Sequence, residues 1–396
     1  MKYPIWFFRL LFASWMIPAG LNHFVEIFPQ PMGTQPLSME LVSALIDSHL
    51  FDLVKAVELL AGIGVLLGIY TPLCLLICLP VSFGVFYWDA PLEGWGSGAA
   101  IFGYATLVCN TVLCLAYYKS YQSMFTLRAE VPPESKQLVL IGRIILGGAM
   151  VLFAANILFL SDAPAGAQPL AEQLMTSLVN SRLLHVALAL QLVAGALLLA
   201  GIMVPLALTA QMTIAANALF WAVLLNQTPL LAIFTLIVFA INGLLMIAYL
   251  PYYKGVLDEN ALAAGEEAGK GYDDLFNHHR GHTSKGDYIP ALLSVLAAMA
   301  FFGYFVAGRT ADFCMLVLMY PLFILLIRRF RDMGQTPWLI FAPLLLVLMA
   351  FDVHLDYFSL GETGDGLINW LAVLATAAVA VWGAISGRKE RAAASI

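Results

Sequence analysis

Long apolar runs separated by short polar segments dominate the pattern along the chain. An α-helix needs about 20 residues to cross the roughly 30 Å hydrocarbon core of a bilayer, and each run is close to that length. Such segments must be helical, because the bilayer core offers the backbone no other hydrogen-bond partner. The pattern predicts an all-α polytopic membrane protein with about twelve transmembrane helices, near residues 4–24, 51–69, 72–88, 98–118, 137–160, 183–201, 205–225, 229–250, 288–307, 311–327, 336–352 and 366–386.

Composition agrees with this class, since 61% of the residues are hydrophobic and only 11% are charged, far outside the range of soluble domains. The net charge of −6 gives no electrostatic footprint for nucleic acid, so lipids and other membrane proteins are the expected partners. The sequence lacks Walker, G-x-G-x-x-G and H-E-x-x-H motifs and therefore shows no self-contained catalytic site. Whether the chain is an enzyme stays open; at most it is a membrane subunit of an oxidoreductase.

The distribution of charge predicts the orientation of the helices. If both termini share one side, nearly all Lys and Arg residues fall on that side, and the opposite loops are acidic. Lys and Arg are concentrated in cytoplasmic loops, so both termini are predicted to be cytoplasmic. The first span has no small-residue cleavage site and is expected to be a retained helix.

The chain also contains an internal repeat. Writing ELLAGIGVLLGIYTPL from Glu58 above QLVAGALLLAGIMVPL from Gln191 aligns two glycines and a proline. Nearly the same offset pairs residues of other helices: Arg9 with Arg143, Asn22 with Asn156, Trp88 with Trp221 and Asn110 with Asn242. Both copies begin in the cytoplasm, which predicts two parallel four-helix repeats, residues 1–130 and 136–256. A cytoplasmic linker, residues 257–287, and a third four-helix membrane module, residues 288–396, complete the prediction.

The first repeat resembles the DoxX family of bacterial four-helix membrane proteins. The residues that carry this resemblance are Arg9, Gly20, Glu58, Gly62, Gly68 and Thr71. The second repeat keeps Arg143, Gly195 and Gly201 but has Ala154 and Gln191 in place of Gly20 and Glu58, so it resembles a diverged copy. Where family members often carry a Lys after the first glycine, this chain has Asn22 and His23. The resemblance implies a bacterial inner-membrane protein linked with membrane redox processes, including thiosulfate oxidation that feeds quinone.

The C-terminal third resembles a different bacterial membrane family, number 805 among the domains of unknown function. Two motifs carry this resemblance, GHTSKGDY from Gly281 to Tyr288 and RRFRDMGQTPW from Arg328 to Trp338. The resemblance implies a membrane architecture for the C-terminal third but no particular chemistry.

Glu58 is an ionisable residue inside a predicted span, and such residues are by default functional candidates. Asp52 and Lys55 precede it at intervals of three residues, so a local ion ladder near the interface is the structural alternative. The second repeat has no such charges, which favours a ligand over a requirement of the fold. We predict a polar pocket that opens outward, with His23 as a partner of Glu58. The candidate ligand-binding residues are Arg9, Asn22, His23, Lys55 and Glu58, with counterparts Arg143, Asn156, His185 and Gln191 in the second repeat.

Two cytoplasmic segments of the C-terminal third form a basic cluster. They contain Arg280, Lys285, Asp287, Arg328, Arg329, Arg331 and Asp332. One interpretation is an anchor at anionic lipid head groups. The other pairs the two Asp residues with the Arg residues to hold the segments together, or lets the cluster bind phosphate or an acidic partner. The linker stretch 258–274 is expected to be a surface helix.

Metal and haem are not favoured as cofactors. Asp352, His354 and Asp356 alternate, and alternate residues share a face only in an extended chain, so they are weak metal candidates. Cys74, Cys78, Cys109 and Cys114 contain no C-x-x-C motif, and buried Cys is a common small apolar residue.

Three functions from different classes remain open. The first is a redox-associated protein that binds quinone or another small ligand, or passes electrons or protons with a partner subunit. The second is a transporter or lipid-handling protein. The third is a scaffold subunit of a membrane complex.

Overall fold

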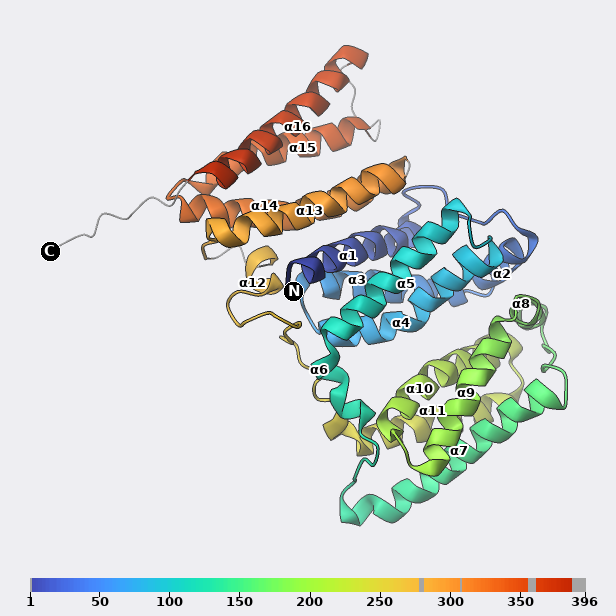
Figure 1. Ribbon diagram of the computed structural model, residues 1–396. Helices are drawn as coiled ribbons and strands as arrows, with labels where there is room; N and C mark the ends of the chain where they lie inside the picture. Colours follow the sequence, from blue (N-terminus) through green and yellow to red (C-terminus); the bar gives the residue numbers. More distant parts are fainter. Residues whose placement is uncertain (1, 278–280, 307, 355–360, 387–396) are drawn as a thin grey trace. The chain divides into compact units, whose positions relative to one another are not determined.

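The structure is a computed structural model that describes residues 2–277, 281–306, 308–354 and 361–386 (Figure 1). Every regular element in these ranges is helical, and none is a strand. Ten of the helical segments are long and apolar enough to cross a membrane, so the prediction of an all-α polytopic membrane protein is confirmed. The described residues divide into two compact units, one with residues 1–18, 62–69 and 262–396 and one with residues 19–61 and 70–261.

The ten candidate spans match ten of the twelve predicted ones. They are α1 (Lys2–Val25), α4 with η1 (Thr71–Leu92), α5 (Gly98–Ala116), η3 with α7 (Pro133–Phe159), α9 (Leu183–Ala200), α10 with η4 (Val204–Asn226), α11 (Pro229–Ala248), α13 (Lys285–Phe305), α14 (Arg309–Asp332) and the greater part of α16 (Glu362–Ile385). The remaining two are α3 (Leu50–Leu67), whose apolar sequence is interrupted by three charged residues, and α15 (Phe341–His354), which has only 14 residues. A count of twelve therefore stays a prediction.

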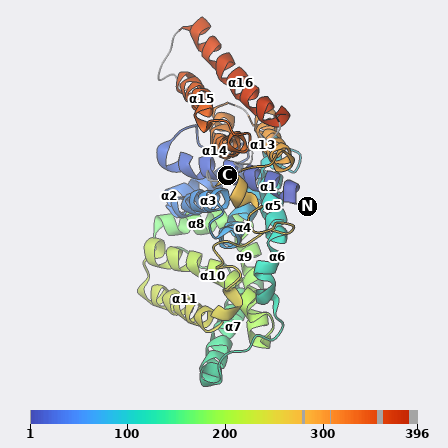
Figure 2. The ribbon, with the colours of Figure 1, turned by 90° about the vertical axis from the view of Figure 1, so that its left-hand side faces the viewer.

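Two runs of elements follow each other in the same order along the chain, and Figure 2 draws the first run above the second. Short helices α2 (Pro36–Asp47) and α8 (Pro169–Asn180) have 12 residues each. The helices that follow them, α3 and α9, have 18 residues each, and α4 (Thr71–Tyr87) and α10 (Val204–Phe220) have 17 each. Both α4 and α10 continue into a π-helical turn, η1 (Trp88–Leu92) and η4 (Trp221–Asn226).

Hydrogen bonds recur in the two runs at nearly the same sequence offset. The indole of Trp88 donates to the carbonyl of Ser38 at 3.0 Å, and that of Trp221 donates to Ala171 at 3.0 Å. The hydroxyl of Tyr121 donates to the carbonyl of Pro72, and the hydroxyl of Tyr253 to that of Pro205, both at 2.8 Å.

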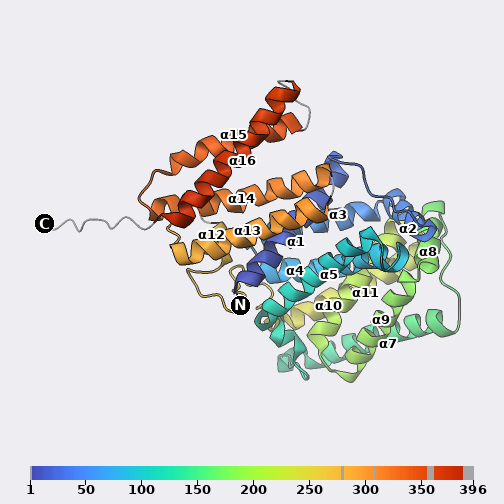
Figure 3. The same cartoon turned by 45° about the horizontal axis from the view of Figure 1, so that its top comes forward.

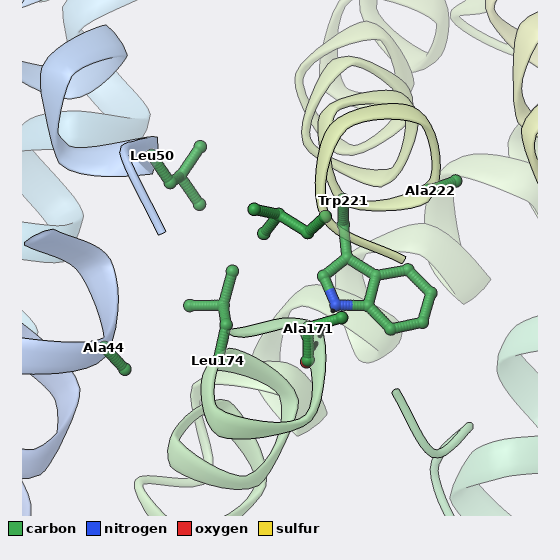
Figure 4. Close-up of a cluster of buried hydrophobic side chains, with 7 residues drawn as sticks. Ala44, Leu50, Ala171, Leu174, Trp221 and Ala222 are labelled. Atoms are coloured by element: carbon green, nitrogen blue, oxygen red, sulfur yellow. Dashed lines mark hydrogen bonds between the residues drawn. The ribbon is translucent and has the colours of Figure 1, made fainter. Parts of the chain in front are cut away.

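Helices α2 and α8 were not predicted from the sequence. Each begins with a proline in its first turn, a position where the missing N–H costs no hydrogen bond. They lie against each other, joined by an apolar cluster of Ala44, Leu50, Ala171, Leu174, Trp221, Ala222 and Leu225 (Figure 4). Polar contacts flank the cluster, since Gln173 donates to Asp47 and Asn180 donates to Glu40, both at 2.8 Å.

The smaller unit contains α13 to α16, the first part of α1 and the end of α3. Helix α13 packs on α14 and α15 packs on α16 (Figure 3). The helix expected over residues 258–274 is wrong. This stretch forms turns and one five-residue helix, α12 (Tyr272–Phe276), because Gly265, Gly269 and Gly271 interrupt it and the first two adopt positive φ angles, which glycine tolerates and a helix excludes.

Candidate functional site

The charged residues of α3 form a buried ion pair. The ammonium of Lys55 lies 2.7 Å from Oε2 of Glu58, as expected for residues three apart on one helix face. Glu58 is 2% exposed and Lys55 is 8% exposed. The Lys55 ammonium also lies 4.9 Å from the centre of the Phe51 ring, a position that a cation favours. The pair is therefore largely buried, with its two charges compensating each other.

Helix α1 approaches α3 most closely beside this pair. A Cβ atom on Gly20 would lie 2.7 Å from the carbonyl oxygen of Lys55 and 2.6 Å from the nitrogen of Leu59. Both distances are too short for non-bonded contact with backbone that cannot move aside. Glycine at position 20 thus lets α1 lie close to the backbone of Lys55 and Leu59.

The other polar residues of the predicted pocket have partners of their own. Nε2 of His23 lies 2.6 Å from Oδ1 of Asp52, and Nδ1 of His49 lies 3.1 Å from Oδ2 of the same carboxylate. Asn22 accepts a hydrogen bond from the backbone N–H of Phe28 at 2.7 Å and so fixes the chain where it leaves α1. The structure pairs His23 with Asp52 rather than with Glu58, so the histidines and Asp52 form a polar layer one helical turn before Lys55.

Arg9 lies at the opposite end of α1. About fourteen residues separate it from His23, which corresponds to about 20 Å along a helix. Its Nε donates to the carbonyl of Val65 at 2.8 Å, and its Nη2 pairs with Asp273 at 2.7 Å. The structure therefore places Arg9 in a separate cluster and leaves Lys55 and Glu58 as the buried charges of the candidate pocket.

The equivalent place in the second half is polar but neutral. Gln191 donates to the backbone carbonyl of Met150 at 3.3 Å, and Gln211 contacts the sulfur of the same residue. Leu188, at the position of Lys55, is buried. Asn156 donates to the hydroxyl of Ser161 at 2.8 Å, whereas Nδ1 of His185 is buried and has no hydrogen-bond partner among the described residues.

Sequence reasoning missed Glu93, which holds the loop between α1 and α2. Its carboxylate accepts hydrogen bonds from the N–H of Thr34 at 2.8 Å, the hydroxyl of Thr34 at 2.6 Å, the N–H of Gln35 at 3.2 Å and the hydroxyl of Ser38. Burial raises the pKa of Glu93, but these hydrogen bonds outweigh it and lower the pKa to about 2. Asn226 holds the matching loop by accepting from the N–H of Ala167. In the sequence, the loop-holding role of Glu93 is indicated only by its alignment with Asn226 of the second half.

The basic cluster of the C-terminal third is a structural junction. Nε of Arg328 donates to the hydroxyl of Thr283 at 3.1 Å, and Nε of Arg329 donates to the carbonyl of Gly383 at 2.8 Å. The two predicted segments are thus joined by the hydrogen bond from Arg328 to Thr283. The two Asp residues pair elsewhere, because Asp332 pairs with Arg329 within the same helix and Asp287 pairs with Lys2. Binding of lipid head groups, phosphate or an acidic partner by this cluster stays a prediction.

Most of the remaining residues of this basic cluster also lie in the described part of the smaller unit. Asp287 pairs with Lys2 at 3.3 Å, and Lys285 donates to the carbonyl of Ile385 at 3.3 Å. Arg331 is half-buried in the last turn of α14. Arg280 lies outside the described residues.

Metal candidates gain no support from the described part of the chain, where no three His, Cys, Asp or Glu side chains gather around one point. The side chains of Asp352 and His354 and the whole of Asp356 lie outside what the structure describes. None of the five cysteines, all of which lie in the described residues, forms a disulfide.

Comparison with protein-family models, with curated proteins and with solved structures finds no match for this chain.

Proposed function

We propose that this membrane protein is of the DoxX type, lies in the bacterial inner membrane with both termini in the cytoplasm, and binds the head group of a quinone at Lys55 and Glu58. The observation that carries the proposal is the ion pair buried inside a helix of the first half, whose matching positions in the second half hold Leu188 and Gln191.

Burying the charges of Lys55 and Glu58 carries an energetic cost. Moving an ion out of water costs several kcal/mol even after relaxation, and a buried pair recovers this only with good geometry. The second half forms a helix of the same length without the two charges. The fold therefore does not require them, and their retention in the first half points to a ligand that uses them.

The chemistry of the pair suits a quinone. The Lys55 ammonium can donate a hydrogen bond to a ring carbonyl, and the Glu58 carboxylate can accept one from a hydroxyl of the reduced ring. Reduction of a quinone to a quinol takes up two protons together with two electrons. The Lys55 ammonium can donate one of these protons, whereas the Glu58 carboxylate only accepts hydrogen bonds, so the second proton must come from outside the pair. In this proposal the electrons come from a partner oxidoreductase.

The matched helix lengths support the two-repeat organisation. So do the hydrogen bonds to backbone carbonyls that Trp88 and Tyr121 donate in the first half and Trp221 and Tyr253 donate at the matching positions of the second. The predicted boundaries, 1–130 and 136–256, together with a four-helix C-terminal module, are part of the proposal.

A transporter or lipid-handling protein is the second candidate, and one observation favours it. The π-helical turns η1 and η4 form the last turns of corresponding spans of the two halves. π-Helical turns are frequent at functional sites, and irregular helices at matching positions of two repeats are typical of transporters. A scaffold role has no comparable observation in its favour.

The test is mass spectrometry of the organic extract of protein purified in mild detergent. We expect a near-stoichiometric quinone in the wild type and its loss in Glu58→Gln. Glu134→Gln is the matched control, because Glu134 is exposed; this variant should retain the quinone. Absence of any quinone from the wild type would refute the proposal and favour the transporter.

A further inference from the structure

Two arginines occupy matching places in the two halves. Arg9 of α1 lies beside Gly68 and Arg143 of α7 (Lys136–Phe159) lies beside Gly201, and both glycines have a φ near +70°, as positions that follow a helix often do. A Cβ on Gly68 would lie 2.7 Å from Nη2 of Arg9, and a Cβ on Gly201 would lie 3.0 Å from both terminal nitrogens of Arg143. Each guanidinium therefore sits at the same corner between two long helices.

In the first half this corner is filled by the linker. Arg9 is fully buried, pairs with Asp273 at 2.7 Å and lies 3.8 Å from the centre of the Tyr272 ring. Glu266 adds a second attachment, since it accepts from the indole of Trp6 at 2.8 Å. The linker thus supplies a carboxylate and an aromatic cover to the guanidinium.

In the second half no carboxylate of the described residues fills the same corner. Nε of Arg143 is buried and has no hydrogen-bond partner among the described residues, and no carboxylate of these residues pairs with Arg143. The elements that pack on α7 explain this. Helices α9 and α11 contain no acidic residue, and the only acid of η3 is the exposed Glu134. An uncompensated Arg in a membrane-spanning segment is costly, so an external anion is expected.

The surface around Arg143 indicates which anion fits. Leu140 and Ile144 on α7 and Leu199 and Ile202 at the end of α9 are between 39% and 50% exposed. Helix α7 has 24 residues, about 36 Å of helix, which exceeds the roughly 30 Å hydrocarbon core. Arg143 follows the second turn of α7, about 10 Å from the start of the helix, and is therefore within reach of the head-group layer, where long basic side chains extend towards the interface.

We propose that Arg143 binds the phosphate of a phospholipid. The guanidinium presents paired N–H donors that match a phosphate, and the exposed apolar side chains around it match acyl chains. The lipid phosphate takes the place that the carboxylate of Asp273 has in the first half. This site is separate from Lys55 and Glu58, so its failure leaves the quinone proposal standing, and the reverse also holds.

The experiment compares the thermal stability of delipidated protein before and after addition of phosphatidylglycerol. The wild type should show a saturable rise in Tm, and Arg143→Gln should lose most of it. Arg128→Gln is the matched control, because Arg128 is exposed and lies outside the spans; it should keep the full rise. A Tm rise as large with inorganic phosphate alone would assign the site to a soluble phosphate and overturn the lipid proposal.

Arg143→Lys provides a second variant in case the Gln variant fails to fold. It keeps the charge but loses the paired donors, so its Tm rise should be clearly smaller than that of the wild type. A rise equal to that of the wild type in either variant would show that the lipid binds elsewhere and would overturn the proposal.

Discussion

The buried ion pair makes a prediction that separates a ligand site from a structural element. Glu58→Gln removes one charge and leaves the ammonium of Lys55 in a place that is 8% exposed. Removing one partner of a buried pair costs about 3–5 kcal/mol, because the other charge is left uncompensated. We expect Glu58→Gln to lower the free energy of unfolding by about that amount.

The double variant Lys55→Leu with Glu58→Gln is the matched comparison. It installs Leu188 and Gln191, the residues that the second half has at these positions. Replacing a buried pair with neutral residues of similar size is often neutral or stabilising by about 1–4 kcal/mol. We therefore expect the double variant to be at least as stable as the wild type.

The assay is reversible unfolding of the purified protein in mixed micelles, followed by tryptophan fluorescence. If the double variant is destabilised as much as the single one, the pair holds the fold together and the argument for a ligand is wrong. If neither variant changes the free energy of unfolding, the two charges are solvated in the membrane and the burial argument is wrong.

Three further predictions concern other contacts. Gly20→Ala should destabilise the protein by about 1–3 kcal/mol through overpacking against Lys55 and Leu59. Gly148→Ala is the control, because a Cβ there meets nothing within 4 Å, and it should be neutral or slightly stabilising in the same unfolding assay. The pKa of Glu93 is lowered from an ordinary 4.5 to about 2, so its contribution to stability is complete above pH 4.5 and is lost as the pH falls through 2. In Glu93→Gln, hydrogen exchange should show loss of protection at Thr34 and Gln35 at every pH. Equal protection in the wild type and the variant at neutral pH would contradict this role of Glu93. Asp273→Asn should loosen the linker from Arg9 and speed proteolysis between residues 258 and 277. Glu259→Gln, at an exposed side chain, should leave the cleavage rate unchanged. Equal cleavage rates in the wild type and both variants would rule out the attachment of the linker to Arg9.

The hydrophobic pattern predicted the helical membrane class and the positions of ten candidate spans because long apolar segments have few alternatives in a bilayer. It was less informative where polar residues enter a helix. Helix α3 carries three charges and α15 is short, so length and composition alone do not decide whether they cross the membrane. Helices α2 and α8 were missed because twelve-residue helices that bury one face lack the continuous apolar run of a span.

The contacts of the candidate site could likewise be predicted from the sequence only in part. The pairing of Lys55 with Glu58 follows from their spacing on one helix and was foreseen as a local ion ladder. The partners of His23 and Arg9 depend on contacts between elements far apart in the sequence. His23 and Asp52 lie on different helices, and Arg9 pairs with an acidic residue of the linker. No periodicity within one segment could reveal these pairs.

The central claim is that Lys55 and Glu58 bind a quinone, and a direct titration tests it. A short-chain quinone is added to the delipidated wild type and to the double variant Lys55→Leu with Glu58→Gln, and quenching of tryptophan fluorescence reports binding. We expect saturable binding to the wild type and at least tenfold weaker binding to the equally stable double variant. Equal affinity for both proteins, or no saturable binding to the wild type, would contradict the claim.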